Sequence, residues 1–457
     1  MTRLGFVCAI AAATGCGGHD GPCDPAVPSD CDHGQVCEQV TGSATPACFA
    51  PVELHGRVLD LATHAGIAGA RVVAVDVNGA AASGVALSAA DGSYALQVPA
   101  ERATGGAPAA FPVALRADAA GYQSFPGTIR QPLPIDVATA VMMTGGYVVQ
   151  SALTDVGLLA RTGAAVGALH GHVEVPADHA GVLVVAELAG TGAAAIAARD
   201  GDYALFNLAP GHYTVTAYAR GHVYTPAELD VAADSKLDLA LASDPPGALS
   251  GQIDRVDGGS ATGTSVIAFV ESTFDPLTGR GVPPPGLRAP ASGPPSITGA
   301  FTIDGVPPGK YVVVAAFEND GLVRDPDHCI NGTADVHVQV AAGQTAAAGT
   351  FKVTGALAVM SPGATQAEAV TTAPMLTWAD DAGEDHYAVD VFDALGQRVW
   401  NTTIPGVSGG TPAVAYGGPM ASGMYYQFRV TSTKTQGTGT TCELSRTEDL
   451  RGVFYVP

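Results

Sequence analysis

The sequence predicts an all-β protein built from tandem β-sandwich domains, and three observations support this fold class. Short alternating apolar runs are interrupted by many turn-forming residues, with 58 Gly and 32 Pro in 457 residues, a pattern typical of strands and turns. No long segment has the apolar stripe of an amphipathic helix. One strand–turn–strand unit recurs along the chain, and the length suits about three to four domains of ~100–150 residues each.

The clearest copy of this unit spans residues 200–217. Asp200-Gly201 predicts a hairpin turn, because Gly accepts the positive φ that such turns need. Tyr203 and Leu205 then share one face of a strand, by the period of two. Pro210-Gly211 predicts a second tight turn, and alternate apolar residues line one face of the strand that follows.

The unit recurs at residues 298–314 and, without its Pro-Gly half, at 91–96. A shorter signature, in which a glycine lies between two apolar positions, precedes each copy. Its three occurrences are Leu54-His55-Gly56-Arg57-Val58, Leu169-His170-Gly171-His172-Val173 and Leu249-Ser250-Gly251-Gln252-Ile253. The chain is therefore predicted to contain three copies of one β module.

The order of these motifs, G-x-V, then A-x-V, then D-G-x-Y, then P-G-x-Y, resembles the carboxypeptidase regulatory-like domain, a transthyretin-like β-sandwich. The resemblance covers roughly residues 52 to 354 and implies three modules at 52–161, 166–244 and 247–354. Members of this family are accessory modules found beside many activities, so the resemblance implies a fold and no particular chemistry.

From residue 357 to 457 the pattern changes. Trp378 ends a short apolar strand, and Tyr426 begins a Tyr-x-Phe-x-Val strand preceded by Met420. These features resemble a fibronectin type III domain. The resemblance implies a buried Trp378 and a corner tyrosine, Tyr426, whose hydroxyl bonds to the backbone.

The first 15 residues are predicted to be a signal peptide. Leu4–Ala13 is apolar and too short to span a bilayer, but it suits a signal peptide. Ala13-Thr14-Gly15-Cys16 resembles a bacterial lipobox, which implies diacylation of Cys16 and, in a cell with two membranes, anchoring at the outer one. The alternative is an ordinary secretory signal cleaved nearby.

Residues 16–51 are predicted to be a disulfide-stapled spacer. Four cysteines, Cys23, Cys31, Cys37 and Cys48, lie in a segment too small to bury a core, and in an exported chain they are best paired as two disulfides with three possible connectivities. A zinc site is the alternative, but the spacing lacks a C-x-x-C pair. Cys329 and Cys442 each stand alone in their domains, and we predict that they pair and lock two domains together.

Candidate chemical sites are few. His170, His172 and Glu174 share one strand face, as a metal site requires, but that face is also the one expected to point to solvent. The acidic run 380–385 offers ligands for calcium or forms a solvated turn. Residues 406–410 match G-x-S-x-G as a string, but Pro405 and the following Gly-Thr-Pro exclude the strand–helix context of a nucleophile elbow. We therefore predict no catalytic residues, no metal and no cofactor.

A proline-rich insertion, Phe274–Ile297, interrupts the third module. Its prolines remove donors of strand-to-strand hydrogen bonds, so it cannot be a central strand. Long loops are either functional or tolerated. This insertion is expected to be tolerated, and it is also the best place to look for a contact with a partner.

The sequence thus predicts a non-enzymatic, exported cell-envelope protein, anchored to a membrane through a lipid and used for adhesion, spacing or binding through its loops. The net charge of −22 argues against nucleic-acid partners. One alternative is a carbohydrate-binding surface protein, which would need an exposed aromatic platform from Tyr224, Tyr416 or Phe274. Another is an accessory subunit of an envelope peptidase.

Overall fold

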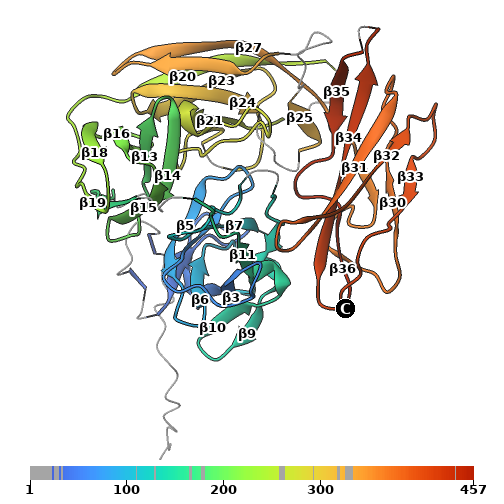
Figure 1. Cartoon of the computed structure of the whole chain (residues 1–457), viewed down its shortest axis with the longest axis horizontal. Coiled ribbons are helices and arrows are strands. Elements are labelled where there is room, and N and C mark those ends of the chain that lie inside the picture. The colour runs from blue at the N-terminus through green and yellow to red at the C-terminus, as the bar shows by residue number, and fades with distance from the viewer. Residues whose placement is uncertain are drawn as a thin grey trace, which may run out of the picture.

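The computed structural model describes residues 23–24, 30–31, 34–109, 111–127, 130–163, 167–176, 181–256, 263–291, 293–315, 320–324, 333–437 and 439–457. They form four β-sandwich units after a small N-terminal hairpin, which confirms the predicted fold class (Figure 1). The helical elements in these ranges are short 3-10 turns: η2 (Val137–Thr139), η3 (Ala152–Thr154) and η4 (Glu271–Thr273). No helix in the described ranges is long and apolar enough to cross a membrane.

Module one has two sheets around its own core. In the first sheet, β3 pairs with β6 on one side and runs parallel to β10 and β11. The second sheet has the order β5-β4-β7-β8. The strands are β3 (Val52–Asp60), β4 (Arg71–Val75), β5 (Ala81–Leu87), β6 (Ser93–Val98), β7 (Pro112–Asp118), β8 (Ile135–Asp136), β9 (Val141–Met143), β10 (Gly146–Val149) and β11 (Val156–Leu158).

Module two is the shortest of the three. One sheet has the order β15-β12-β19, and the other has the order β14-β13-β16-β17, with β18 also pairing with β16. The strands are β12 (Gly167–His172), β13 (Leu183–Leu188), β14 (Thr191–Ile196), β15 (Asp202–Leu208), β16 (Gly211–Ala219), β17 (His222–Val223), β18 (Ala227–Val231) and β19 (Ser235–Lys236).

Module three repeats the plan with sheets β23-β20-β27-β25 and β22-β21-β24-β26. The proline-rich insertion contributes β22 to this module, and β22 lies at the edge of its sheet, as the prolines require. The strands are β20 (Gly247–Arg255), β21 (Val266–Val270), β22 (Arg288–Ala289), β23 (Ala300–Val306), β24 (Gly309–Ala315), β25 (Leu322–Arg324), β26 (Val336–Val340) and β27 (Thr345–Gly355).

The final domain has one sheet in the order β28-β30-β33 and a second in the order β29-β36-β34-β31-β32, with β35 also pairing with β34. Its strands are β28 (Val359–Ser361), β29 (Glu368–Ala369), β30 (Met375–Trp378), β31 (His386–Asp393), β32 (Arg398–Pro405), β33 (Ala413–Ala415), β34 (Tyr425–Thr435), β35 (Thr441–Arg446) and β36 (Val453–Tyr455). Trp378 is fully buried, and the hydroxyl of Tyr426 accepts a hydrogen bond from the Ala421 N–H at 2.9 Å.

The recurring glycine and aromatic residues of the three modules form cross-strand pairs. The pairs are Gly56 with Tyr94, Gly171 with Tyr203, and Gly251 with Phe301. The glycine is required because another backbone segment passes over it.

In module two, a Cβ on Gly171 would lie 1.8 Å from the carbonyl oxygen of Leu237. The hydroxyl of Tyr203 donates to that same oxygen at 2.6 Å. Glycine therefore admits the neighbouring segment, and the tyrosine holds it there. Phe301 has no hydroxyl and instead packs edge-on against Phe351, with ring centroids 5.8 Å apart.

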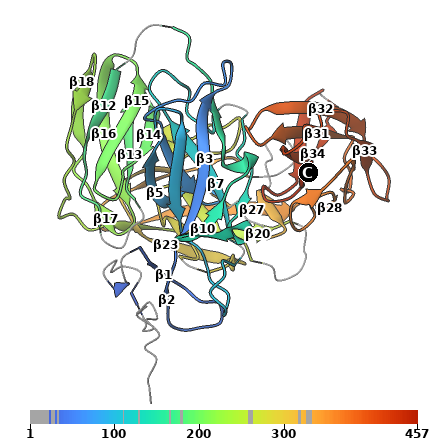
Figure 2. The same ribbon diagram turned by 90° about the horizontal axis from the view of Figure 1, so that it is seen from below.

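The three modules pack against one another as one block rather than as separate beads. Apolar residues of modules one, two and three belong to a single buried cluster. In Figure 1 the blue module one lies below the yellow module three, with the green module two on one side and the red final domain on the other. Figure 2 shows the same close arrangement from below. The tandem modules therefore pack side by side rather than extending end to end.

Candidate functional site

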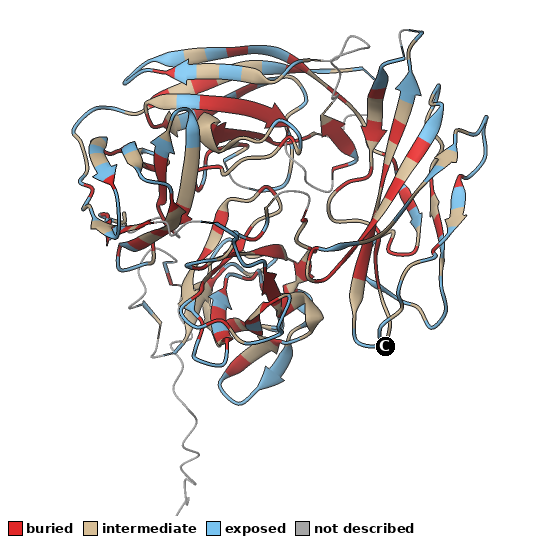
Figure 3. Ribbon diagram, in the orientation of Figure 1, coloured by how far each residue is buried: buried red, intermediate tan, exposed pale blue. Residues whose placement is uncertain are grey.

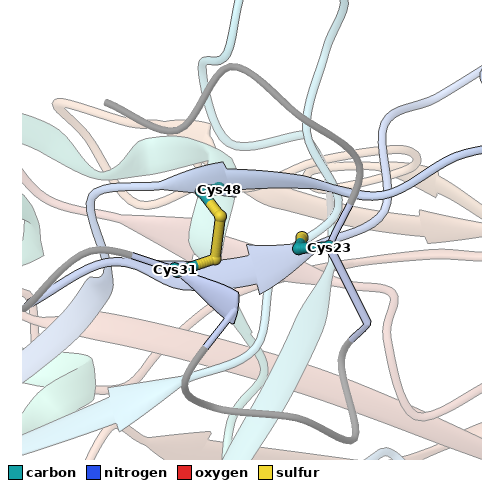
Figure 4. A group of neighbouring side chains, drawn as sticks. All are labelled: Cys23, Cys31 and Cys48. Carbon is teal, nitrogen blue, oxygen red and sulfur yellow. A yellow bond between two sulfur atoms is a disulfide. The ribbon is translucent and has the colours of Figure 1, made fainter. Parts of the chain in front are cut away.

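The N-terminal cysteines form two disulfides, Cys23–Cys37 and Cys31–Cys48, with Cα–Cα distances of 5.9 and 5.6 Å. Cys37 lies on β1 (Val36–Glu38) and Cys48 on β2 (Ala47–Phe49), so the disulfides tie Cys23 and Cys31 to the two strands of this hairpin. The sulfur atoms of Cys23, Cys31 and Cys48 lie within 4.8 Å of one another (Figure 4). Each of them is committed to a disulfide, so these sulfurs are not thiolate ligands for zinc.

This hairpin is docked firmly on module one through a buried ion pair. Arg102 is fully buried and donates from Nε to Glu38 at 2.5 Å and from Nη2 to the carbonyl oxygen of Ala50 at 2.7 Å. Its guanidinium also stacks on the rings of Phe49 and Tyr147. Burial raises the pKa of Glu38, although the charge of Arg102 opposes that rise. The described part of the predicted spacer is thus fixed to the first sandwich.

The other predicted cysteine sites fall partly outside the described residues. Cys442 is buried and disulfide-bonded, and its partner lies outside the described ranges. Cys329 is also outside them, so its pairing with Cys442 stays a prediction. The same holds for the signal peptide and for lipidation of Cys16.

The candidate metal face of module two points to solvent. His170, His172 and Glu174 are exposed, while the residues between them face the core. The backbone N–H of His172 donates to the carboxylate of Asp238. The Nδ1 atom of its ring lies 3.4 Å from Oδ1 of Asp202. These contacts are ordinary surface pairs of the strand and its neighbours.

The acidic run of the final domain builds a turn. Asp380 accepts from the Tyr387 hydroxyl at 2.9 Å and from the Gly409 N–H at 2.9 Å. Glu384 accepts from the Val407 N–H at 3.0 Å. The carboxylates therefore hold the glycine-rich loop 406–410. A nucleophile elbow would need a helix after it, but residues 406–412 are irregular and lead into the strand Ala413–Ala415.

The proline-rich insertion and the final domain converge on one junction. Arg280 of the insertion and Arg429 of β34 both donate to the carboxylate of Asp449, the latter at 2.8 Å. Burial alone would raise the pKa of Asp449, but the neighbouring guanidiniums outweigh it and hold the pKa below its usual value. Desolvation lowers the pKa of Arg429 to about 10. The insertion therefore connects module three to the final domain through the ion pair of Arg280 and Asp449.

A cavity of about 250 Å³ lies beside this ion pair, between module one, module three and the final domain. Arg116, Arg130, Arg280 and Arg429 contribute to its lining. Arg130 donates to the carbonyl oxygen of Leu395 in the final domain at 2.9 Å and lies over the Phe125 ring, with its guanidinium carbon 4.6 Å from the centroid. Arg130 therefore connects module one to the final domain at this cavity, and Arg280 connects module three to it.

A carboxyl group also sits between module three and the final domain. Glu448 accepts a hydrogen bond from the Gly321 N–H at 2.7 Å. Burial raises its pKa to about 7, because desolvation disfavours the charged form, and the charge of Asp320 adds to the rise.

Modules one and two are joined by apolar sheet faces and by side chains that bond to the backbone of the neighbouring module. Arg116 donates to the Ala194 carbonyl oxygen, and Asn207 binds the carbonyl oxygens of Ala119 and Tyr122 at 3.1 and 2.8 Å. Asn207 has a φ of 64°, a conformation that Asn tolerates better than most residues. None of these joining residues was predicted from the sequence.

Tyr224, Tyr416 and Phe274 do not form the exposed aromatic platform that the carbohydrate-binding alternative would need. Tyr224 and Tyr416 are buried, and Phe274 packs against Phe269 with ring centroids 5.9 Å apart. Instead, Tyr425 and Tyr455 are a cross-strand pair of the final domain with stacked rings, 4.9 Å apart at the centroids and inclined by 19°. The alternation of side chains along a strand predicts that Tyr425 and Tyr455 point away from the core, because each lies next to a buried core residue.

The stacked tyrosines border a second and larger cleft, of about 760 Å³, between module one and the final domain. Module one contributes the β9–β10 hairpin, whose Val141 and Met143 are 64% and 58% exposed. The tip of this hairpin is among the exposed parts of module one in Figure 3. The polar residues of the lining are Asp136, Thr139, Gln150, Ser151, Thr365 and Gln366.

Comparison with known proteins adds little to this geometry. No protein-family model and no curated protein matches the chain. Similar solved structures include the Bacillus anthracis TIE protein, at 14% identity and a TM-score of 0.17, over 85% of this chain and 65% of that one. BcpA, the major pilin subunit of Bacillus cereus, is similar at 11% identity and a TM-score of 0.18, over 66% of this chain and 99% of its own.

Two B repeat units of the collagen-binding protein of Staphylococcus aureus are also similar, at 12% identity and a TM-score of 0.17, over 87% of this chain and 99% of that one. The chain spans only 65% of the length of the TIE protein. Likenesses with identities and TM-scores this low carry no argument about the function of this chain.

Proposed function

We propose that the chain is a non-enzymatic, exported protein of the cell envelope, held to a membrane by a lipid on Cys16, whose four sandwiches act as one rigid block for adhesion or binding. The observation that carries this proposal is the pair of disulfides at the N-terminal end. Disulfides persist in oxidising compartments and are rare in the cytosol.

The docking of the disulfide hairpin supports the mechanical part of the proposal. Because Arg102 and Glu38 join the hairpin to module one inside a buried contact, a load applied near the anchor would pass directly into the block. The apolar and charged junctions would then pass it on to the final domain. The modules would resemble carboxypeptidase regulatory-like domains, and the final one a fibronectin type III domain.

The anchor is tested by replacing the cysteine. In the bacterial host, the Cys16→Ala variant should move from the membrane fraction to the soluble periplasmic or secreted fraction. Cys8→Ala, from the same apolar segment, is the matched control and should stay in the membrane fraction. Mass spectrometry of the wild type should find a diacylated N-terminal cysteine at position 16. Unchanged membrane fractionation of Cys16→Ala would contradict the lipid anchor.

A further inference from the structure

The larger cleft lies where two domains meet, which is a common place for a ligand site. Its volume of about 760 Å³ is within the range of ligand pockets, ~300–1,000 Å³. One wall comes from module one and the other from the β34 and β36 strands of the final domain. The packing of the sandwiches therefore creates the cleft, and no single module has it.

The tyrosines of the cleft are not part of the core. On the adjacent positions of the same strands, Tyr426 and Phe454 are buried and stack on each other, with centroids 5.4 Å apart. Alternation along each strand then turns Tyr425 and Tyr455 to the other face of the sheet, where they line the cleft half-buried. The pair offers aromatic surface and two hydroxyl groups in one place.

The polar groups of the cleft are uncharged, with one exception. Gln150 and Gln366 are exposed amides on opposite walls, and hydroxyl residues accompany them. Asp136 is the charged residue of this lining, and its carboxylate accepts from the Ala138 N–H at 2.9 Å. Among the described residues that line the cleft there is no Lys or Arg, so the cleft does not suit an anion.

We propose that this cleft binds a neutral glycan chain, an assignment that rests on the proposed role in envelope binding. Sugars present C–H faces that pack on aromatic rings and hydroxyl edges that bond to amides and hydroxyls. The cleft supplies both kinds of group, while the exposed Val141 and Met143 extend its apolar wall. An extended apolar peptide is the competing occupant, since β9 is an edge strand that a peptide could lengthen.

The test uses the full mature protein in detergent and a panel of uncharged hexasaccharides: cellohexaose, maltohexaose, laminarihexaose and N-acetylated chitohexaose. Isothermal titration should detect binding of at least one of them. Tyr455→Ala and Tyr425→Ala should weaken it roughly three- to tenfold, the range expected for a lost aromatic contact. Tyr455→Phe should keep most of the affinity, because it keeps the ring.

Two further variants separate binding from folding. Gln150→Ala and Gln366→Ala change exposed side chains and should also weaken binding by a few fold, with unchanged thermal unfolding. Met142→Ala is the matched control, because Met142 is exposed and does not line the cleft, and it should leave binding unchanged.

Three results would overturn the proposal. The first is no binding of any of these hexasaccharides at millimolar concentration. The second is binding that none of the tyrosine and glutamine variants weakens. The third is binding of an extended apolar peptide that Val141→Lys blocks and Tyr455→Ala does not. Each outcome is independent of the membrane fractionation of Cys16→Ala, so failure of the glycan site and failure of the proposed anchor can be told apart.

Discussion

Two junctions of the molecule depend on different interactions. One joins modules one and two, and the other joins module three to the final domain. In the first, Val73 and Val75 of one sheet share a buried cluster with Leu183 and Val185 of another. In the second, the carboxylate of Asp449 joins guanidiniums from two domains. Sheet faces join the repeated modules, whereas loops and charges join the unlike domain.

The two junctions show two ways in which β-sandwich modules can be joined into one block. An apolar sheet face can pack on another without precise partners, because hydrophobic burial is non-directional. A buried ion pair needs each partner in place, since a guanidinium left without its carboxylate is costly. The second junction should therefore be the more sensitive of the two to single substitutions.

The largest effect is expected for Asp449→Ala. This change leaves both Arg280 and Arg429 without their shared carboxylate in a largely buried site, and it should destabilise the protein by about 3–5 kcal/mol in urea unfolding. The control is Asp230→Ala, because Asp230 pairs with His212 at the surface and its loss should cost less than about 0.5 kcal/mol. Equal costs for the two variants would contradict the charged junction.

The apolar junction is tested by Leu183→Ala. Leu183 is 0% exposed and belongs to the buried cluster shared by modules one, two and three. The substitution should cost about 2–4 kcal/mol, as for other buried leucines. Leu277 is 95% exposed, and Leu277→Ala should be nearly neutral. If the three modules separate in solution, Leu183 lies on an open face and its substitution will resemble that of Leu277.

The smallest effect concerns the pH dependence of the charged junction. Since the pKa of Glu448 is raised to about 7 in the folded protein, from an ordinary value of 4.5, the folded state takes up a proton that the unfolded state releases in this range. Its contribution to stability is present below pH 4.5 and is lost as the pH rises through 7. Glu448→Gln should remove this dependence.

Glu448→Gln is therefore expected to be more stable than the wild type at pH 8. The shift of about 2.5 pKa units corresponds to at most about 3.5 kcal/mol, at about 1.4 kcal/mol per unit, and solvent screening reduces the expected difference to roughly 2–3 kcal/mol. Near pH 4.5 the two proteins should be nearly equal. Thermal unfolding of both proteins between pH 4.5 and pH 8 measures the difference. A constant difference at all pH values would show that the carboxyl group does not titrate in this range.

The strand pattern predicted the sandwiches, because alternation and turn residues are local. The same period places Gly171 and Tyr203 on the inward faces of their strands, whereas their cross-strand pairing is a finding of the structure. The junctions were not predicted, and one local signal for them was available. The runs Val72–Val75 and Val182–Ala186 do not alternate, which indicates strands covered on both faces.

No comparable local pattern in the sequence predicts the charged junction. Arg280 and Asp449 are 169 positions apart, and neither lies in a repeated motif. One wall of the cleft could be predicted from the sequence, because Tyr425 precedes a core tyrosine and must therefore point away from the core. Its other wall comes from a hairpin of module one, and only the packing of the domains brings the two walls together.

The central claim is that the four sandwiches form one block, and small-angle X-ray scattering of the mature protein tests it most directly. A compact chain of this length has a radius of gyration of roughly 22 Å, and the account predicts a value close to that. An end-to-end string of the same sandwiches would give a value at least about 1.5 times as large. A radius in that larger range would contradict the account.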